Sequence, residues 1–282
     1  MPIECRQLSP KHVITDILRI AGTKPFPNDA LIEIGDLFAF SANAMRVALN
    51  RLENSNIIEK AISSTAGTGN ATLHFQLCSS TNLLSDFIEE WKGGAERVKP
   101  WNNNHWLVCH LPKKPDRSMR TRSIRALGLL GFHPSADNLW VRPDNLSTGF
   151  ERVNQQLLHF GLEPDAYVLG STQMSPQLSE QWQSQWLSPE NKEAYEIHYP
   201  DMIASLKQSQ QRLAELSTKD AMIETFQLGS NTIHMLTKDP LVPEQLLPNN
   251  SRNTLCHTML EYDAAGRKIW LQKIDDIINR TL

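Results

Sequence analysis

The sequence has few cysteines and no long apolar run. Its four cysteines are scattered and form no Cys-x-x-Cys pair, which argues against a disulfide framework and for reduced thiols. No apolar run approaches the roughly 20 residues that a membrane-spanning helix needs, and the N-terminus lacks the basic-then-apolar layout of a signal peptide. With 282 residues, 40% hydrophobic and 21% charged, we expect a cytoplasmic globular protein of two or three domains without membrane contact.

Catalytic and metal-binding motifs are also missing. The sequence contains no Gly-x-Ser-x-Gly, His-Glu-x-x-His or Walker pattern. His105, Cys109 and His110 lie close together but lack the spacing of a zinc finger, and a strand would send Cys109 and His110 to opposite faces. The sequence therefore predicts no catalytic residues, no metal and no cofactor, and hence a protein that is not an enzyme.

The net charge of −3 gives no overall attraction to polyanions, but the charges are unevenly distributed. Residues 1–95 carry 8 Lys and Arg against 10 Asp and Glu, whereas residues 97–125 carry 8 against a single acid. Much of this basic cluster falls in a predicted helix after Asp116, whose arginines are Arg117, Arg120, Arg122 and Arg125. Two interpretations stay open: the helix binds an anion, such as the phosphates of a ligand or of DNA, or it is a solvated face that pairs with nearby acids.

The most informative stretch is residues 26–77, where the pattern predicts a helix, a turn, a second helix and a β-hairpin. The second helix begins after Ser41, which is suited to be its N-cap, and its apolar residues Met45, Leu49 and Leu52 recur at helical spacing. Strand-favouring residues then flank a turn-rich tip. This order is typical of a winged helix-turn-helix, in which the exposed face of the second helix enters the major groove of double-stranded DNA.

Six polar residues are the predicted DNA contacts: Ser41, Asn43, Arg46, Asn50, Arg51 and, at the base of the hairpin, Lys60. Asparagine can pair bidentately with adenine and arginine with guanine, so we expect Arg46 and Asn50 to read bases, and Arg51 and Lys60 to position the DNA backbone. From Ala61 to Leu77 the hairpin contains no Lys or Arg, which predicts weak affinity and a shallow salt dependence for this domain alone. A merely solvated helix face stays possible.

Three consecutive domains are predicted, and together they indicate the α+β class. Residues 1–95 form the winged helix-turn-helix domain. Residues 96–175 alternate strand and helix, with strands near 106–111, 139–143 and 167–170 and a fourth expected near 131–134, which favours a small ferredoxin-like α+β sheet. Residues 176–282 lose the strand signal and are predicted to form a helical domain.

Several segments resemble the PaaX family, repressors of phenylacetic acid catabolism. The segment Asn43-Ala44-Met45-Arg46-Val47-Ala48-Leu49-Asn50-Arg51-Leu52 is similar to that family's recognition helix. Further similar segments are His105-Trp106-Leu107-Val108, Leu139-Trp140-Val141-Arg142-Pro143 and Asp239-Pro240-Leu241-Val242-Pro243-Glu244-Gln245-Leu246-Leu247-Pro248. The resemblance covers almost the whole chain. The chain departs from the family in its uncharged wing and in Asn249-Asn250-Ser251, where the family has a Trp-Pro-Gly-like step.

The resemblance implies a winged helix, a central domain like the Cas2 ferredoxin-like fold, and a helical C-terminal domain. It also implies a homodimeric repressor of an aromatic-acid catabolic operon, released from a palindromic operator by an aryl-acyl-CoA such as phenylacetyl-CoA. We expect the effector's phosphates near Arg117, Arg120 or Arg122, with Trp140 as a further effector-binding candidate. The alternatives are a metal-dependent nuclease related to Cas2, although the acid nearest the first strand, Asp116, is better explained as a helix cap, and a protein-interaction module that has lost DNA binding.

Overall fold

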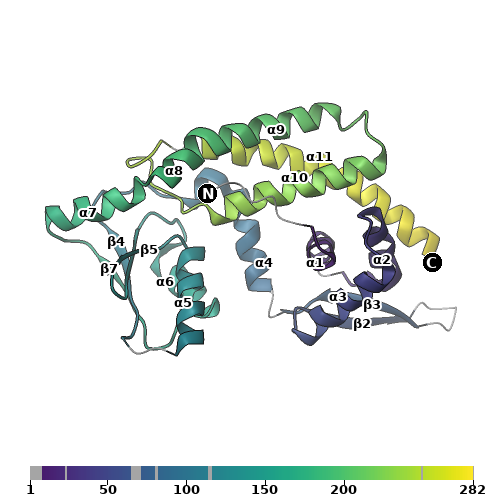
Figure 1. Ribbon diagram of the computed structural model, residues 1–282, viewed down its shortest axis with the longest axis horizontal. Helices are drawn as coiled ribbons and strands as arrows, with labels where there is room; N and C mark the ends of the chain where they lie inside the picture. Colours follow the sequence, from purple (N-terminus) through teal and green to yellow (C-terminus); the bar gives the residue numbers. More distant parts are fainter. Residues whose placement is uncertain are drawn as a thin grey trace. The chain divides into compact units, whose positions relative to one another are not determined.

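The computed structural model describes residues 8–22, 24–64, 71–79, 82–113, 116–248 and 250–281, and it is a mixed α+β structure with two small antiparallel sheets (Figure 1). The α+β class is thus confirmed. Contacts divide the chain into two compact units. Unit 1 consists mainly of Glu90–Ser205 and Ile233–Thr258, and unit 2 of Glu4–Glu89, Leu206–Thr232 and Met259–Leu282. This division differs from the three consecutive domains predicted, because the C-terminal helices contribute to both units.

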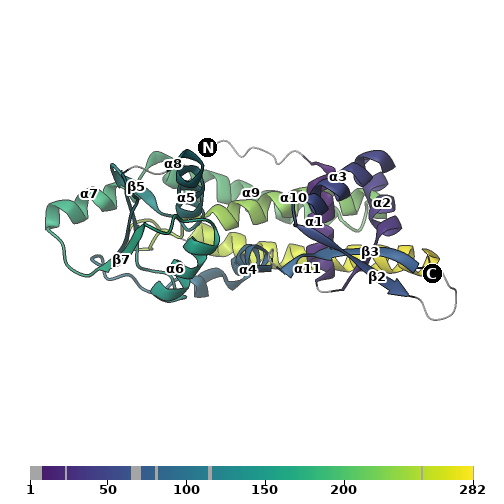
Figure 2. The ribbon, with the colours of Figure 1, turned by 90° about the horizontal axis from the view of Figure 1, so that it is seen from below.

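Unit 2 begins with helices and a three-stranded sheet of order β1-β3-β2. Its elements are α1 (Pro10–Ala21), β1 (Phe26–Pro27), α2 (Asn28–Leu37), α3 (Ala42–Asn54), β2 (Ile58–Ser64), β3 (Ala71–Leu77) and α4 (Asn82–Glu89). Two helix starts follow from serine caps: Ser9 accepts from the His12 N–H, and Ser41 from the Ala44 N–H. Figure 2 shows β2 and β3 as a long antiparallel ribbon beside α1, α2 and α3.

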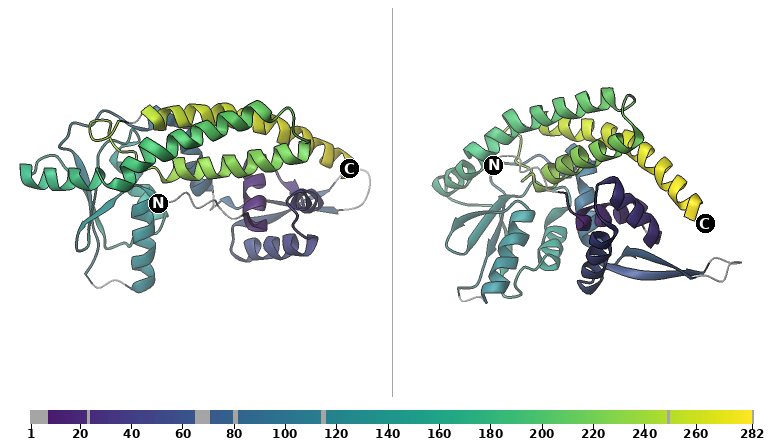
Figure 3. Two further views of the ribbon diagram at one scale, coloured as in Figure 1. Left: turned by 45° about the horizontal axis from the view of Figure 1, so that its top comes forward. Right: turned by 45° about the vertical axis from the view of Figure 1, so that its right-hand side comes forward.

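The core of unit 2 joins the N-terminal helices to the last two helices, α10 (Thr218–Lys238) and α11 (Asn250–Thr281). Figure 3 shows α10 and α11 running side by side. Phe226 of α10 packs against Trp270 of α11, with 5.8 Å between the two ring centroids. Phe38, just after α2, packs against both rings at 5.1 and 6.0 Å. Aromatic contacts of this kind fix the packing of the α2 end against α10 and α11.

Unit 1 is built around a four-stranded antiparallel sheet of order β5-β6-β4-β7. Its elements are the 3₁₀ helix η2 (Glu90–Arg97), β4 (Trp106–His110), α5 (Arg117–Leu129), β5 (His133–Ala136), β6 (Leu139–Pro143), α6 (Gly149–His159), β7 (Tyr167–Ser171), α7 (Pro176–Trp186), α8 (Pro189–Glu193), the π-helix η3 (Ala194–His198) and the start of α9 (Tyr199–Arg212). The fourth strand expected near 131–134 is β5, which begins two residues later. Figure 1 shows α5 and α6 along one side of this sheet.

Tryptophans organise the packing around β4. Trp106 is fully buried and meets Trp101 and Trp182 edge to face, with centroids 5.1 and 5.3 Å apart. The neighbouring Leu107 and Cys109 are also buried, and alternation along the strand places them on the other face of the sheet from Trp106. Among the described residues, no helix combines the length and the apolar character needed to cross a bilayer.

Candidate nucleic-acid interface and predicted effector residues

The turn between α2 and α3 holds the two helices close together. A Cβ added to Gly35 would lie 2.5 Å from the Met45 Cγ, so glycine is what lets α3 approach α2 at this point. The Phe40 N–H donates to the Gly35 carbonyl at 3.0 Å, and Ala39 between them has a φ of 60°. A non-glycine residue in this left-handed region is uncommon, and no residue pattern around Ala39 predicts it.

The polar face of α3 is exposed along its whole length. Met45, Leu49 and Leu52 are buried at 2% exposure or less and anchor the helix on the core. The exposed positions follow helical spacing and form one continuous stripe, made of Asn43, Arg46, Val47, Asn50, Arg51 and Asn54. The predicted base-reading residues therefore share one solvent-facing surface, which we call the α3 face.

The six predicted DNA contacts differ in how much of their bonding capacity is already used. Ser41 is occupied as the N-cap of α3, with its Oγ 3.2 Å from the Ala44 nitrogen. The Lys60 ammonium pairs with Glu53 at 2.8 Å. By contrast, Arg46, Asn50 and Arg51, together with Asn43, have no hydrogen-bond or ion-pair partner anywhere in the described part of the chain. These four side chains keep their hydrogen-bonding groups available for a ligand.

The hairpin beside α3 adds little positive charge. Strands β2 and β3 pair in register from Ile58 with Leu77 to Ser64 with Ala71, and the tip predicted at residues 65–70 lies outside the described residues. Lys60 pairs in register with Phe75, and Gln76 donates to Glu59 at 2.7 Å. The described part of the hairpin therefore presents polar groups and one lysine that is already paired.

The predicted effector residues on α5 point in different directions. Arg117 and Arg122 are exposed, whereas Arg120 is half-buried and donates to the Asn138 Oδ1 at 2.6 Å. Arg122 packs its stem over Gly161. Because residues two apart on a helix are separated by about 160°, Arg120 and Arg122 lie on nearly opposite sides of α5. Trp140 is half-buried on β6, opposite Cys109. The cavities described below are lined by other residues.

Asp116, the acid considered for a nuclease, caps α5. Its Oδ1 accepts from the Ser118 N–H at 2.8 Å and from the Met119 N–H at 3.0 Å, which confirms the helix-cap interpretation. Within the residues that the structure describes, no group of three or more His, Cys, Asp and Glu side chains is placed to hold a metal ion. No observation on these residues favours metal-dependent cleavage.

A buried arginine that sequence patterns did not single out lies at the end of β6. Arg142 is 1% exposed, and burial lowers its pKa to about 9. Its guanidinium donates to the carbonyls of Leu130 and Pro143 and to the Asn145 Oδ1. Asn145 in turn donates to the Leu241 carbonyl at 2.7 Å. Arg142 is therefore fully engaged as a structural link inside unit 1.

A buried carboxylate organises the segment after α10. Asp239 accepts from the hydroxyls of Tyr195 and Tyr199, each at 2.8 Å, and from the Leu241 N–H at 2.6 Å. Burial, followed by the charge of Asp239, raises the pKa of both tyrosines well above the usual value, so both remain neutral donors. Beside this cluster lies an open pocket of about 500 Å³ of empty space, lined by Lys192, Tyr195, Glu196, Leu247, Pro248, Asn250 and Ser251.

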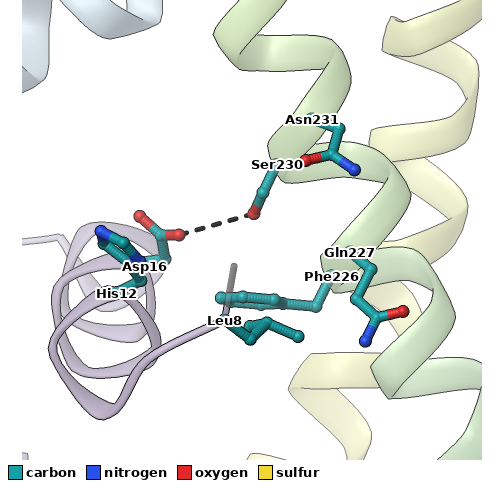
Figure 4. A pocket seen from close by; sticks show the side chains of 7 residues that line it. All are labelled: Leu8, His12, Asp16, Phe226, Gln227, Ser230 and Asn231. Atoms are coloured by element: carbon teal, nitrogen blue, oxygen red, sulfur yellow. Dashed lines mark hydrogen bonds between the residues drawn. The ribbon is translucent and has the colours of Figure 1, made fainter. Parts of the chain in front are cut away.

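A smaller pocket lies inside unit 2 between α1 and α10 (Figure 4). Ser230 donates weakly to the Asp16 carboxylate at 3.5 Å, and Asp16 also pairs with Arg19 at 2.7 Å. Phe226 and Leu8 supply the apolar side of the pocket, as Figure 4 shows. We interpret this pocket as a polar joint between the two helices.

The comparisons with known proteins concern the fold alone. No protein-family model matches the chain, and no curated protein matches it either. Among solved structures, the chain is similar to the uncharacterized protein Rv0674 from Mycobacterium tuberculosis, with 16% sequence identity and a TM-score of 0.51. The match covers 94% of this chain and 97% of that chain, so the likeness extends over both units.

Proposed function

We propose that this protein is a DNA-binding transcriptional regulator that contacts double-stranded DNA through the α3 face. The observation that carries the proposal is the stripe of exposed side chains on α3, of which Arg46, Asn50 and Arg51 have no partner among the described residues. Arginine and asparagine are the side chains that pair bidentately with guanine and adenine in the major groove. In this proposal α1, α2, α3 and the β2–β3 hairpin are a winged helix-turn-helix.

The order of elements supports this proposal in both units. In unit 2, three helices precede a hairpin, and the close α2–α3 turn at Gly35 leaves α3 exposed, as expected for a recognition helix. In unit 1, the order β4-α5-β5-β6-α6-β7 is the β-α-β-β-α-β order of ferredoxin-like domains. Together with the similar segments along the chain, this favours a PaaX-like regulator.

The proposed regulator is a cytoplasmic homodimer on a palindromic operator. Two recognition helices about one DNA turn apart, roughly 34–36 Å, would read the two half-sites. By resemblance to the PaaX family, the effector is an aryl-acyl-CoA that releases the repressor. Such release requires that the effector bind one conformational state better than the other.

The test is a selection from random-sequence duplexes, followed by anisotropy titrations of the best duplex at several salt concentrations. Loss of a bidentate base contact costs about 1–3 kcal/mol, so Arg46→Ala should weaken binding by roughly 5- to 150-fold and relax the preference at one base pair. Arg51→Ala removes a proposed phosphate contact, so it should weaken binding to all duplexes and lower the salt slope by about 1.

Arg267→Ala is the matched control, because Arg267 is a surface arginine on α11 that pairs with Asp263 at 2.7 Å. It should leave the affinity for the selected duplex unchanged. If no duplex sequence is enriched, or if Arg46→Ala and Arg267→Ala bind alike, the α3 face is not a DNA-reading surface, and the interaction module is the better interpretation.

A further inference from the structure

A cavity within unit 1 is lined by Arg252 and Trp91, whose side-chain N–H groups are buried and have no acceptor among the described residues. It lies between η2, the end of α10 and the first turns of α11, and contains about 230 Å³ of empty space, part of it open to solvent. The lining residues are Trp91, Gly94, Arg97, Leu236, Leu241, Arg252, Asn253 and Cys256. None of them is acidic, so the cavity walls carry two positive charges and no negative one.

Arg252 is the residue that most clearly suits this cavity to a ligand. Its side chain is buried, with the residue only 3% exposed. Its three guanidinium nitrogens, Nε, Nη1 and Nη2, are buried without a hydrogen-bond partner among the described residues. The indole Nε1 of Trp91, on the same cavity, is likewise buried without an acceptor, and Trp91 is 2% exposed. Buried polar groups in folded proteins are normally satisfied, and each exception calls for an explanation.

The second positive charge of the cavity is Arg97. Its nearest acid, Glu90, lies 3.7 Å away and is already bonded to Gln156. Burial lowers the pKa of Arg97; the charges of Glu90 and Asp239 oppose this shift, and the charge of Arg252 adds to it. The oxygens of the nearby Asp239 accept from Tyr195, Tyr199 and the Leu241 N–H, so no hydrogen bond joins this carboxylate to Arg97 among the described residues.

Comparison with Arg142 shows how unusual Arg252 is. Arg142 is equally buried but donates to two carbonyls and to the Asn145 amide oxygen. A buried charge without such partners is strongly destabilising, because it has lost its hydration and gained nothing in exchange. A water molecule in the cavity would accept some of these hydrogen bonds but would add no negative charge beside Arg252.

We propose that this cavity binds an oxyanion, the carboxylate or phosphate group of a small ligand, through Arg252, Arg97 and the Trp91 N–H. Arginine forms bidentate hydrogen bonds with both groups, and the anion supplies the negative charge that the walls lack. The cavity is too small for a nucleotide, so only the anionic group of a larger ligand would enter it. Because all its residues belong to unit 1, the proposal stands independently of DNA binding by α3.

The first experiment measures chemical unfolding of the full chain in sodium chloride, sodium phosphate and sodium acetate at equal ionic strength. A ligand that binds only the folded state at ten times its Kd lowers the unfolding equilibrium constant about elevenfold. We expect a saturable decrease of this kind with phosphate or with acetate, relative to chloride. The anion that saturates at the lower concentration identifies the source, a phosphate or a carboxylate. Equal behaviour in all three salts would overturn the proposal.

The second experiment assigns the response to the cavity. In chloride, Arg252→Met should unfold at a higher denaturant concentration than the parent chain, because it replaces an unsatisfied buried charge with an apolar side chain of similar length. It should also show no saturable response to the effective anion. Arg267→Met, a surface change, should keep the parent's response.

Trp91→Phe keeps an aromatic ring in the core but removes the single N–H donor, so it tests the site even if Arg252→Met fails to fold. It should raise the anion concentration needed for half of the effect by several-fold. A Trp91→Phe variant with the parent's response, or an Arg252→Met variant that still responds, would show that the anion binds elsewhere.

Discussion

Arginines occupy opposite environments in the two units. Arg46 and Arg51 in unit 2 stand on the exposed face of α3, where water hydrates them. Arg142 and Arg252 in unit 1 are 1% and 3% exposed. All four lack an acid within ion-pair distance among the described residues. The same side chain therefore carries different consequences, because a hydrated cation costs the fold almost nothing while a buried one must be compensated.

This difference predicts two kinds of anion binding. Exposed arginines on α3 attract DNA through counterion release, so their contribution weakens steeply with added salt. Arginines inside unit 1 are shielded from mobile ions, and an anion bound there should be less sensitive to ionic strength. Salt dependence is thus the measurement that separates the two sites in one protein.

The largest effect is expected from Asp239→Asn in the interior of unit 1. The substitution keeps the shape of the side chain but removes the negative charge that accepts hydrogen bonds from Tyr195 and Tyr199. Each hydrogen bond to a charged group contributes about 1.5–3 kcal/mol, so the loss in the free energy of unfolding should be roughly 3–5 kcal/mol. Urea unfolding followed by tryptophan fluorescence measures it.

Asp263→Asn is the surface counterpart of that change. Asp263 pairs with Arg267 four residues along α11, at a partly exposed position, and such pairs contribute about 0.3–0.5 kcal/mol. If Asp239→Asn and Asp263→Asn lost similar amounts of the free energy of unfolding, burial would not determine how much a carboxylate contributes to stability in this protein. That result would contradict the difference described between the two units.

An intermediate effect is expected at the turn that presents α3. Ala39 has a φ of 60°, a conformation that costs an L-residue roughly 1–2 kcal/mol, and glycine avoids this cost. Glycine loses more entropy on folding, so Ala39→Gly should stabilise by about 0.5–1 kcal/mol. Ala44→Gly, inside α3, should instead destabilise by about 0.5–1 kcal/mol. Denaturant midpoints of the two variants should therefore shift in opposite directions.

Much of the local structure was predictable from the sequence. Ser41 and Asp116 are N-caps as expected. A short polar side chain directly before apolar residues at helical spacing can accept from the free N–H groups of the first turn. Trp101 and Trp106 lie in the core, the usual place for large apolar side chains. The assignment of the α3 face to DNA and of Arg117, Arg120, Arg122 and Trp140 to an effector stays a prediction.

Features that depend on distant parts of the chain were not predictable. Prolines on both sides of Phe26 favour a loop, but Phe26 of strand β1 pairs with Phe75 of strand β3, a contact that only the folded chain creates. Arg97 was counted with an exposed basic cluster, yet η2 holds it beside a cavity. Arg252 carried no signal at all, since its burial arises where the start of α11 meets a segment about 155–160 positions earlier, around Trp91 and Arg97.

The smallest effect concerns a partly buried histidine in unit 1. His133 packs edge to face on Trp186 at 4.6 Å, and burial, with the charge of Arg142, lowers its pKa. As the pH falls, His133 is therefore protonated at a higher pH in the unfolded chain than in the folded chain. The stability contributed by neutral His133 is present above pH 6.5 and decreases as the pH drops below that value. The slope from one proton is at most about 1.4 kcal/mol per pH unit.

His133→Phe keeps the ring contact with Trp186 and removes the titrating group. Between pH 7 and pH 5 its urea midpoint should therefore fall less than that of the parent chain, whereas His159→Phe, at an exposed position, should follow the parent. Parallel pH curves for the parent and His133→Phe would show that this part of unit 1 admits enough water to hydrate a cation. The same access to water would weaken the argument that Arg252, in its interior, requires an anion.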